Sequence, residues 1–250
     1  MKAVTTALLA VALLLGFGSV GSAEPVTVRY AEGVTRGFPV LRSVKGERLA
    51  QGELVQVARG DRVDSRLTFR FVDGSFYDEQ VTFSQQGTFT LQSYRLVQRG
   101  PSFPEALDAS FDRETERYTV RYKSDTESPE EVIKGKLSLP PDVYNGMLIM
   151  LMKNLPAGAS EVVQIVAFTP KPRLVKMQLA PVADERVTIG DWPVTVTRYA
   201  IKPQLGMFVS LLISDLPDVK CWVVGGEAPG FVRFEGPLYF MGPVWRIDPS

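Results

Sequence analysis

The sequence contains no histidine and one cysteine, Cys221. Without histidine, the chain can form neither a Ser-His-Asp or Cys-His catalytic site nor a histidine-ligated metal site. With one cysteine it can form no intrachain disulfide, so the apolar core must stabilise the fold. Cys221 lies in the strand-like run VKCWVV. We interpret it as a small buried side chain rather than a nucleophile, because a reactive thiol needs an accessible, electropositive site.

Several other functional signatures are missing from the sequence. No GxSxG, P-loop or GxGxxG pattern occurs. Lys and Arg number 28 and Asp and Glu number 28, so no basic excess points to a nucleic-acid partner. Beyond the N-terminus, no apolar run reaches the ~20 residues that a membrane-spanning helix requires. We therefore expect no nucleic acid, no cofactor and no transmembrane segment in the mature chain, and we lean toward a protein that is not an enzyme.

The N-terminus has the pattern of a secretory signal peptide. Lys2 is followed by the apolar run Ala7–Leu15 and then by small residues that end in Gly21-Ser22-Ala23. The apolar run is too short to span a bilayer. We expect cleavage near Ala23 and export to the bacterial periplasm or the exterior. The domain organisation predicted is a signal peptide at residues 1–23 and a single β-rich domain at residues 24–250.

The rest of the chain is dominated by alternation of apolar and polar residues, which is typical of half-buried antiparallel strands. In RLTFRF, Leu67, Phe69 and Phe71 share one face, and Asp73-Gly74 follows as a hairpin signal. The main predicted strands are Arg66–Phe71, Tyr118–Lys123, Ile133–Leu139, Glu161–Phe168, Arg173–Leu179, Trp192–Ala200, Met207–Ile213 and Cys221–Val224. We predict a mainly β fold: a large curved antiparallel sheet, a half-barrel or open barrel, with one principal Met-rich helix packed against it.

That helix is predicted over Asp142–Lys153, in the segment PPDVYNGMLIMLMKNLP. Asp142 is placed to cap its start, and Asn154 can close its end in the left-handed conformation. At about 100° per residue the segment has two adjacent apolar faces, which implies two apolar neighbours. The faces are Val143, Met147, Met150 and Leu151, and Tyr144, Leu148, Met152 and Leu155. Either the sheet curls around a helix that is simply core, or a hydrophobic ligand lies between helix and sheet.

One acidic cluster is a weak candidate for chemistry. Asp73, Asp78 and Glu79 in VDGSFYDEQ have the oxygen ligands that Ca²⁺ prefers, but Phe76 and Tyr77 interrupt the pattern. Solvated acids on a hairpin are the simpler interpretation. Paired carboxylates for glycoside hydrolysis would need a defined separation across a cleft, which no sequence feature provides. We predict no metal site and no catalytic residue.

Two further features can be read in a structural or a functional way. Lys171, Arg173 and Lys176 in TPKPRLVK are either a solvated strand edge or contacts for an anionic headgroup. The C-terminal GPLYF and GPVWR sequences, residues 236–240 and 242–246, form a short echo. They are either two closing strands with buried aromatics or an aromatic rim around a cavity.

The chain resembles two groups of proteins. An antiparallel half-barrel that holds a helix, in an exported protein, resembles the bacterial Lol-type lipoprotein carriers, and this architecture implies a cavity for acyl chains. The sequence also looks like a group of uncharacterised exported bacterial proteins, for which no activity can be carried over. The similar stretches are FVDGSFYDE (Phe71–Glu79), RGPSF (Arg99–Phe103), LPPDVYNGM (Leu139–Met147), TPKPRLVK (Thr169–Lys176), GGEAP (Gly225–Pro229) and EGPLYFMGPVWRI (Glu235–Ile247).

The function predicted is that of a non-enzymatic periplasmic or secreted protein that binds an apolar or lipid-like ligand between helix and sheet. The alternative is a cell-envelope structural or interaction module with a dry core, no small ligand and a protein partner. The candidate ligand contacts are Val143, Tyr144, Met147, Leu148, Met150, Leu151, Trp222 and Trp245, with Lys171, Arg173 and Lys176 as candidate headgroup contacts.

Overall fold

The computed structural model describes residues 25–124, 127–204 and 219–249. These residues form 15 strands and one α-helix. The elements are β1 (Thr35–Gly37), β2 (Val40–Ser43), β3 (Arg48–Arg59), β4 (Arg62–Phe71), β5 (Phe76–Ser84), β6 (Thr90–Arg99), β7 (Ala106–Asp112), β8 (Arg117–Lys123), β9 (Glu131–Lys136), α1 (Leu148–Asn154), β10 (Glu161–Thr169), β11 (Lys171–Ile189), β12 (Trp192–Pro203), β13 (Val219–Val224), β14 (Gly230–Gly236) and β15 (Trp245–Asp248).

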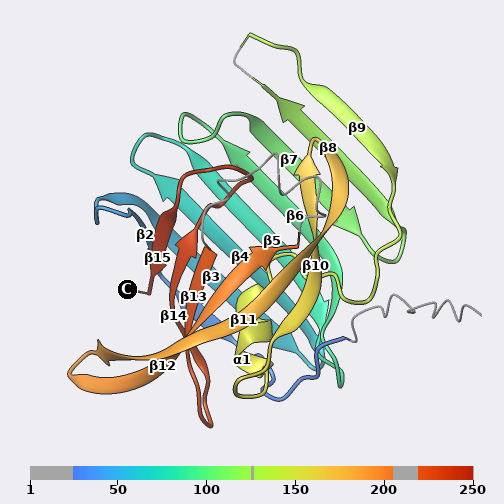
Figure 1. Cartoon of the computed structure of the whole chain (residues 1–250). Helices are drawn as coiled ribbons and strands as arrows, with labels where there is room; N and C mark the ends of the chain where they lie inside the picture. The colour runs from blue at the N-terminus through green and yellow to red at the C-terminus, as the bar shows by residue number, and fades with distance from the viewer. Residues whose placement is uncertain (1–24, 125–126, 205–218, 250) are drawn as a thin grey trace, which may run out of the picture.

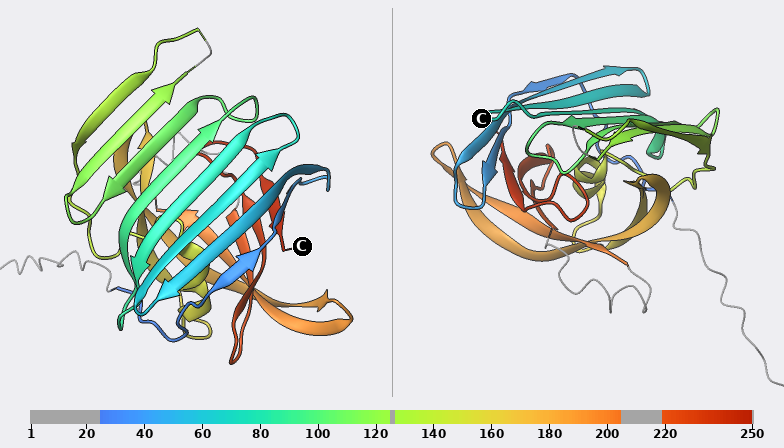
Figure 2. Two further views of the ribbon diagram at one scale, coloured as in Figure 1. Left: turned by 180° about the vertical axis from the view of Figure 1, so that it is seen from behind. Right: turned by 90° about the horizontal axis from the view of Figure 1, so that it is seen from above.

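All of these strands belong to one antiparallel sheet that is made of two meanders. Strands β2 to β9 form the first meander and β10 to β15 the second, and the two are joined where β15 pairs with β2. The edges of the sheet are therefore β9 and β10, and β1 pairs with β3 off this path. The sheet curls so that the two meanders lie on opposite sides of α1 (Figures 1 and 2). The predicted mainly β fold, with a large curved antiparallel sheet and one helix, is confirmed.

The core lies on the inner face of this curled sheet. Phe69, Phe83 and Leu91 come from successive strands of the first meander and are fully buried there. Phe168 of β10 reaches across from the second meander, and its ring stacks against those of Tyr94 and Phe111. Side-chain packing therefore brings β10 onto β6 and β7, although no backbone ladder joins the two edges of the sheet.

The helix is shorter than predicted, because it begins at Leu148 rather than Asp142. Residues 142–147 instead cross to β10, where Val143 forms an isolated parallel bridge with Gln164. Asp142 does not cap the helix: its carboxylate accepts hydrogen bonds from the Gln164 side chain, at 2.9 and 3.0 Å. Gly146 has a φ of 68°, in the left-handed region that interrupts a right-handed helix. Partners on a distant strand thus outweigh the local helical pattern.

Of the predicted strands in the described part of the chain, all but the one at 133–139 fall within observed strands, most of which are longer than predicted. The strand predicted to end at Leu139 ends at Lys136, and the one predicted to end at Leu179 continues to Ile189. The strand predicted at 207–213 lies outside the described residues. Within the described part of the chain, no helix is long and apolar enough to cross a membrane.

The extra length of β11 creates a projecting hairpin, which we call the arm, residues 183–197. β10 pairs with β11 only as far as Leu179, and β13 pairs with β12 only from Val196. Between these points β11 and β12 pair with each other alone. A register shift between Pro181 and Ala183 marks the point where the arm leaves the wall of the sheet (Figure 1).

Candidate functional site

The space between α1 and the sheet is occupied by the chain's own side chains. Val143, Tyr144, Met147 and Leu151 are each 0% exposed, whereas Leu148 and Met150 are partly buried. The Tyr144 hydroxyl accepts a hydrogen bond of 2.9 Å from the backbone N–H of Val26. The six residues predicted on the helix therefore do come together inside the sheet. Four of them have no accessible surface in this structure, so a ligand between helix and sheet remains a prediction.

Buried polar side chains fasten this segment to the sheet. Asn145 makes two hydrogen bonds with the backbone of Val166 on β10, at 2.8 and 2.7 Å. Asn154, which is 1% exposed, accepts hydrogen bonds from the backbone N–H groups of Arg29 and Tyr30 and donates to the carbonyl of Met150. Because buried polar groups are costly without partners, these bonds specify one position for the helix.

A carboxyl group lies beside the same segment on the inner face. The Tyr94 hydroxyl donates a hydrogen bond of 2.8 Å to Glu79. Burial raises the pKa of Glu79 above its usual range, although hydrogen bonds from Tyr94 and Tyr77 partly offset the rise. A Cβ atom at Gly146 would lie 2.4 Å from a Val81 methyl and 3.2 Å from the Glu79 carboxyl carbon. The Glu79 carboxyl group therefore lies close to the segment that leads into α1.

The two tryptophans predicted to contact a ligand lie in different places. Trp245 belongs to an aromatic cluster in the core, with ring centroids 5.5 Å from Phe71 and 6.2 Å from Phe103. Trp222 is buried but lies outside the contiguous core. Its indole N–H donates a hydrogen bond of 2.8 Å to Glu185 at the base of the arm. The structure therefore places Trp222 with the arm and not with α1.

The charged clusters noted in the sequence are divided between the faces of strands. By alternation along β11, Lys171 and Arg173 project to one side and Lys176 to the other, and all three are exposed. Asp78 lies on the outer face, paired with Arg66 at 2.8 Å, whereas the adjacent Glu79 faces inward. Asp73 lies in the β4–β5 turn. Among the described residues, no group of acids, cysteines and histidines could hold a metal ion.

A small hollow of about 160 Å³ lies beside the C-terminal end of α1. Met152, Leu155 and Tyr199 provide apolar surface, and Arg29 and Lys153 lie among the lining residues. Lys153 pairs with Glu32. Ligand pockets usually measure about 300–1,000 Å³. This hollow therefore has room for a small group or the end of a chain, but not for a whole lipid.

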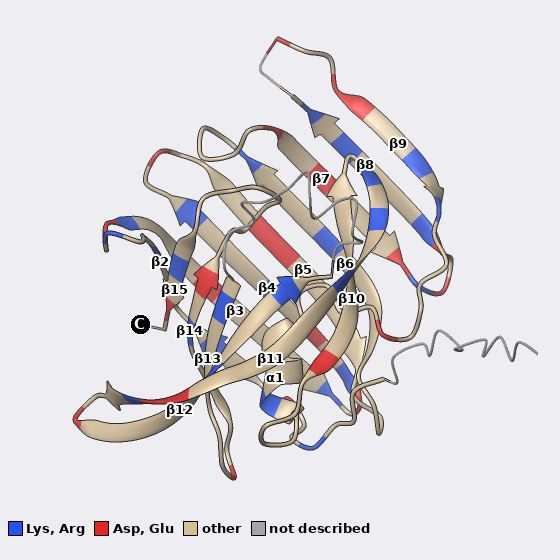
Figure 3. Ribbon diagram, viewed as in Figure 1, with Lys and Arg blue, Asp and Glu red and all other residues tan. Residues whose placement is uncertain are grey.

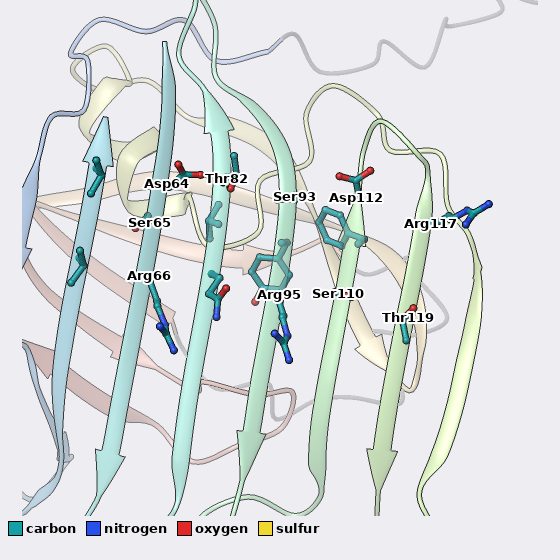
Figure 4. Close-up of a pocket in the computed structure, with 16 residues that line it drawn as sticks. Asp64, Ser65, Arg66, Thr82, Ser93, Arg95, Ser110, Asp112, Arg117 and Thr119 are labelled. Atoms are coloured by element: carbon teal, nitrogen blue, oxygen red, sulfur yellow. Dashed lines mark hydrogen bonds between the residues drawn. The ribbon is translucent and has the colours of Figure 1, made fainter. Parts of the chain in front are cut away.

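A larger hollow of about 700 Å³, which we call the outer trough, lies on the outer face of the first meander (Figure 4). Its lining residues come from β3 to β8. Most of its lining residues have polar side chains, which include hydroxyl, carboxylate and guanidinium groups, and its apolar lining residues are Val55, Val57, Val81, Tyr94 and Phe111. The residues labelled in the close-up are Asp64, Ser65, Arg66, Thr82, Ser93, Arg95, Ser110, Asp112, Arg117 and Thr119.

The arm carries the most exposed aromatic side chain among the described residues. Trp192 is 77% exposed and Ile189, directly opposite it, is 45% exposed. Val187 pairs with Val194 on the same face. Residues that oppose one another in an antiparallel pair project to the same side, so these four side chains form one apolar stripe along the arm. Asp184, Arg186, Thr188 and Thr195 occupy the other face.

The sequence contains a local signal for one face of the stripe but none for the trough. Alternation in WPVTV places Trp192 and Val194 on one face. The same alternation occurs in strands inside a sheet, so it does not reveal that β11 and β12 extend beyond their neighbouring strands here. The trough combines residues from six strands, and only the register brings them together. Cys221 is 0% exposed, so the interpretation of a buried side chain is confirmed, and burial raises the pKa of its thiol to about 12. Its lack of reactivity stays a prediction.

No protein-family description matches the sequence, and no curated protein matches it. Among solved structures, the chain is similar to the crystal structure of a β-barrel-like protein of the domain of unknown function DUF1849 from Brucella abortus. The two share 10% identity with a TM-score of 0.44, over 92% of this chain and 98% of that chain. The resemblance to Lol-type carriers is not confirmed by this comparison. The comparison assigns no activity to this chain.

Proposed function

We propose that this chain is a non-enzymatic interaction module of the bacterial cell envelope, with a filled interior and a protein partner that binds the arm. One observation carries the proposal: Val143, Tyr144, Met147 and Leu151 are completely buried inside, whereas Trp192 is left 77% exposed outside. Export, on which the location depends, is supported by the signal-peptide pattern of residues 1–23.

The base of the arm is fixed, which favours recognition by a preformed surface. Glu185 on β11 accepts hydrogen bonds from Arg198 on β12 and from Trp222 on β13. The Arg233 guanidinium lies 5.9 Å from the centre of the Trp222 ring. These contacts hold β11 and β12, the two strands of the arm, against β13. A partner therefore meets a surface that needs little ordering, which lowers the entropic cost of binding.

The stripe itself suits a protein partner. Trp is enriched among the residues that contribute most of the binding energy at protein interfaces. An isolated two-stranded ribbon is also marginally stable unless something packs on it. The arm also carries Asp184, Glu185 and Asp191 against the single base Arg186. This acidic balance disfavours an anionic membrane surface as the partner.

Site-specific photo-crosslinking in an exporting bacterium tests the proposal. A photoreactive residue replaces Ile189 on the stripe, and in a matched control it replaces the adjacent Thr188 on the polar face. We expect a protein adduct from position 189 that is lost when Trp192→Ser is added, and no such adduct from position 188. Absence of the adduct, or its persistence in the Trp192→Ser variant, would contradict the proposal.

A second candidate function is the binding of a small apolar ligand, and the hollow beside Met152 and Leu155 favours it. Arg29 and Lys153 among its lining residues would suit an anionic end group. Uptake of a short fluorescent fatty acid, weakened in Leu155→Asp and unchanged in Thr188→Asp, would support this candidate. Equal uptake by both folded variants would exclude the hollow as the site.

A further inference from the structure

We infer that the outer trough is a binding site for a neutral oligosaccharide. This inference goes beyond the proposed function and does not depend on the arm, because the trough is built on the other meander. The trough has a volume of about 700 Å³, within the ~300–1,000 Å³ usual for ligand sites. Since neighbouring strands lie ~4.8 Å apart, its six strands span roughly 24 Å. That length suits a linear chain of several sugar units lying across the strands.

The lining offers hydrogen-bonding groups that the protein leaves unused. Within the described residues, the hydroxyl groups of Ser93, Ser110 and Thr119 have no protein partner, and neither does the Arg117 guanidinium. Arg66 and Arg95 each use two nitrogens on the carboxylates of Asp78 and Asp108, respectively. An arginine has five N–H donors, so each of these two guanidinium groups still has N–H donors available for a ligand. Hydroxyl donors and acceptors in such an array match the hydroxyl groups of a sugar.

Charge decides between a neutral and an anionic ligand. The lining residues and their ion-pair partners comprise five arginines and four aspartates, which nearly cancel. Burial raises the pKa of Asp64, but hydrogen bonds from Arg62 and Thr82 outweigh it and hold the value below the usual range. This carboxylate therefore stays ionised inside the trough, where it would repel an anion. Figure 3 shows acidic residues interspersed with the basic ones over these strands.

Other occupants fit the trough less well. An extended peptide adds to a sheet through an unpaired edge, but here the backbone groups of β4 to β7 are engaged in ladders on both sides. A membrane would need exposed apolar surface, and Val55, 37% exposed, is the most accessible apolar side chain of the lining. Val55 and Val57 at one end instead offer contact to the C–H face of a sugar ring.

Isothermal titration calorimetry on the full exported chain tests the inference. The probes are the hexamers of β-1,4-linked N-acetylglucosamine and of glucose, with the hexamer of galacturonic acid as the anionic counterpart. We expect a neutral hexamer to bind with a Kd below about 1 mM, more tightly than its dimer. Ser93→Trp and Ser110→Trp fill the trough and should weaken binding at least about tenfold, or about 1.4 kcal/mol. Ser84→Trp, a matched change on the same face but outside the lining, should have no effect.

A second variant, which adds no side-chain volume, tests the inference even if the tryptophan variants misfold. The triple change Ser93→Ala, Ser110→Ala and Thr119→Val removes the unused hydroxyls and should also weaken binding at least about tenfold. Tighter binding of the acidic hexamer, no binding of any hexamer, or equal binding by wild type and all trough variants would each overturn the inference. Trp192→Ser should leave the titration unchanged, so failure of the arm proposal and failure of this one are separately visible.

Discussion

Replacing Leu151 with alanine measures directly how tightly the interior is filled. Leu151 is 0% exposed and lies in the middle of α1, inside the curled sheet. Leu→Ala changes at fully packed sites cost about 2.7–5.0 kcal/mol, because the lost burial and the remaining void both count. The higher helix propensity of alanine offsets only a few tenths of a kcal/mol of this loss of stability. We expect a loss of about 3 kcal/mol or more, which in a chain of this size lowers Tm by roughly 6–12 °C.

Urea unfolding with far-ultraviolet circular dichroism is the assay, and the midpoint should fall at an unchanged m value. Met150→Ala is the matched control on the same helix. Because Met150 is only partly buried, its replacement should cost about 1 kcal/mol, less than half as much. A loss below about 1 kcal/mol for Leu151→Ala would refute the reasoning. It would mean that the side chain faces open space, as a ligand-filled interior requires.

Two substitutions and one labelling experiment test the buried polar groups and the thiol. The pKa of Glu79 is raised, so the folded state binds its proton more tightly than the unfolded state does. The stability that this proton contributes is fully present below the unfolded pKa, near 4.3, and is lost as pH rises through the folded pKa. Glu79→Gln should therefore gain stability over wild type as pH rises from about 4 to 8, and parallel unfolding curves across that range would contradict this assignment. Asn154→Ala should cost about 1–3 kcal/mol in urea unfolding, since two backbone N–H groups lose their acceptor; a loss no greater than that of Thr188→Ala, a change at an exposed position, would count against it. Cys221 should react with a thiol reagent only in denaturant, because burial raises its pKa to about 12; labelling of the native protein at the rate of free cysteine would argue otherwise.

The strands could be predicted from the sequence because their signals are local. Leu67, Phe69 and Phe71 alternate toward the core in β4, and Gly74 has the positive φ of 86° that the Asp73-Gly74 turn implied. The helix start could not be predicted. Asp142 and Asn145 have the residue types of a helix N-terminus, but their side chains bind Gln164 and Val166 on a strand about twenty positions later. A local pattern does not reveal a distant hydrogen-bond partner.

The same limit applies to the candidate site. The two apolar faces of the Met-rich segment were predicted for a helix that starts at Asp142, but the helix starts at Leu148. The apolar side chains are nevertheless buried, since Val143 and Met147 before the helix are each 0% exposed. Trp222 was predicted to contact a ligand together with residues of the helix, yet its indole N–H donates a hydrogen bond to Glu185 at the base of the arm. The trough depends on the register of six strands, for example Asp64 opposite Thr82 and Thr82 opposite Ser93. Composition and periodicity do not contain that register.

Native mass spectrometry of the mature protein tests the central claim, a filled interior, most directly. The protein is purified without detergent from a bacterium that exports it, and one half of the sample is extracted with organic solvent before measurement. We expect the mass of the mature chain alone in both halves, because Tyr144, Met147 and Leu151 are fully buried and the hollow beside the end of α1, about 160 Å³, is too small for a whole lipid. An excess mass that matches a lipid and disappears on extraction would contradict the account, and the Met-rich segment would then be a ligand site.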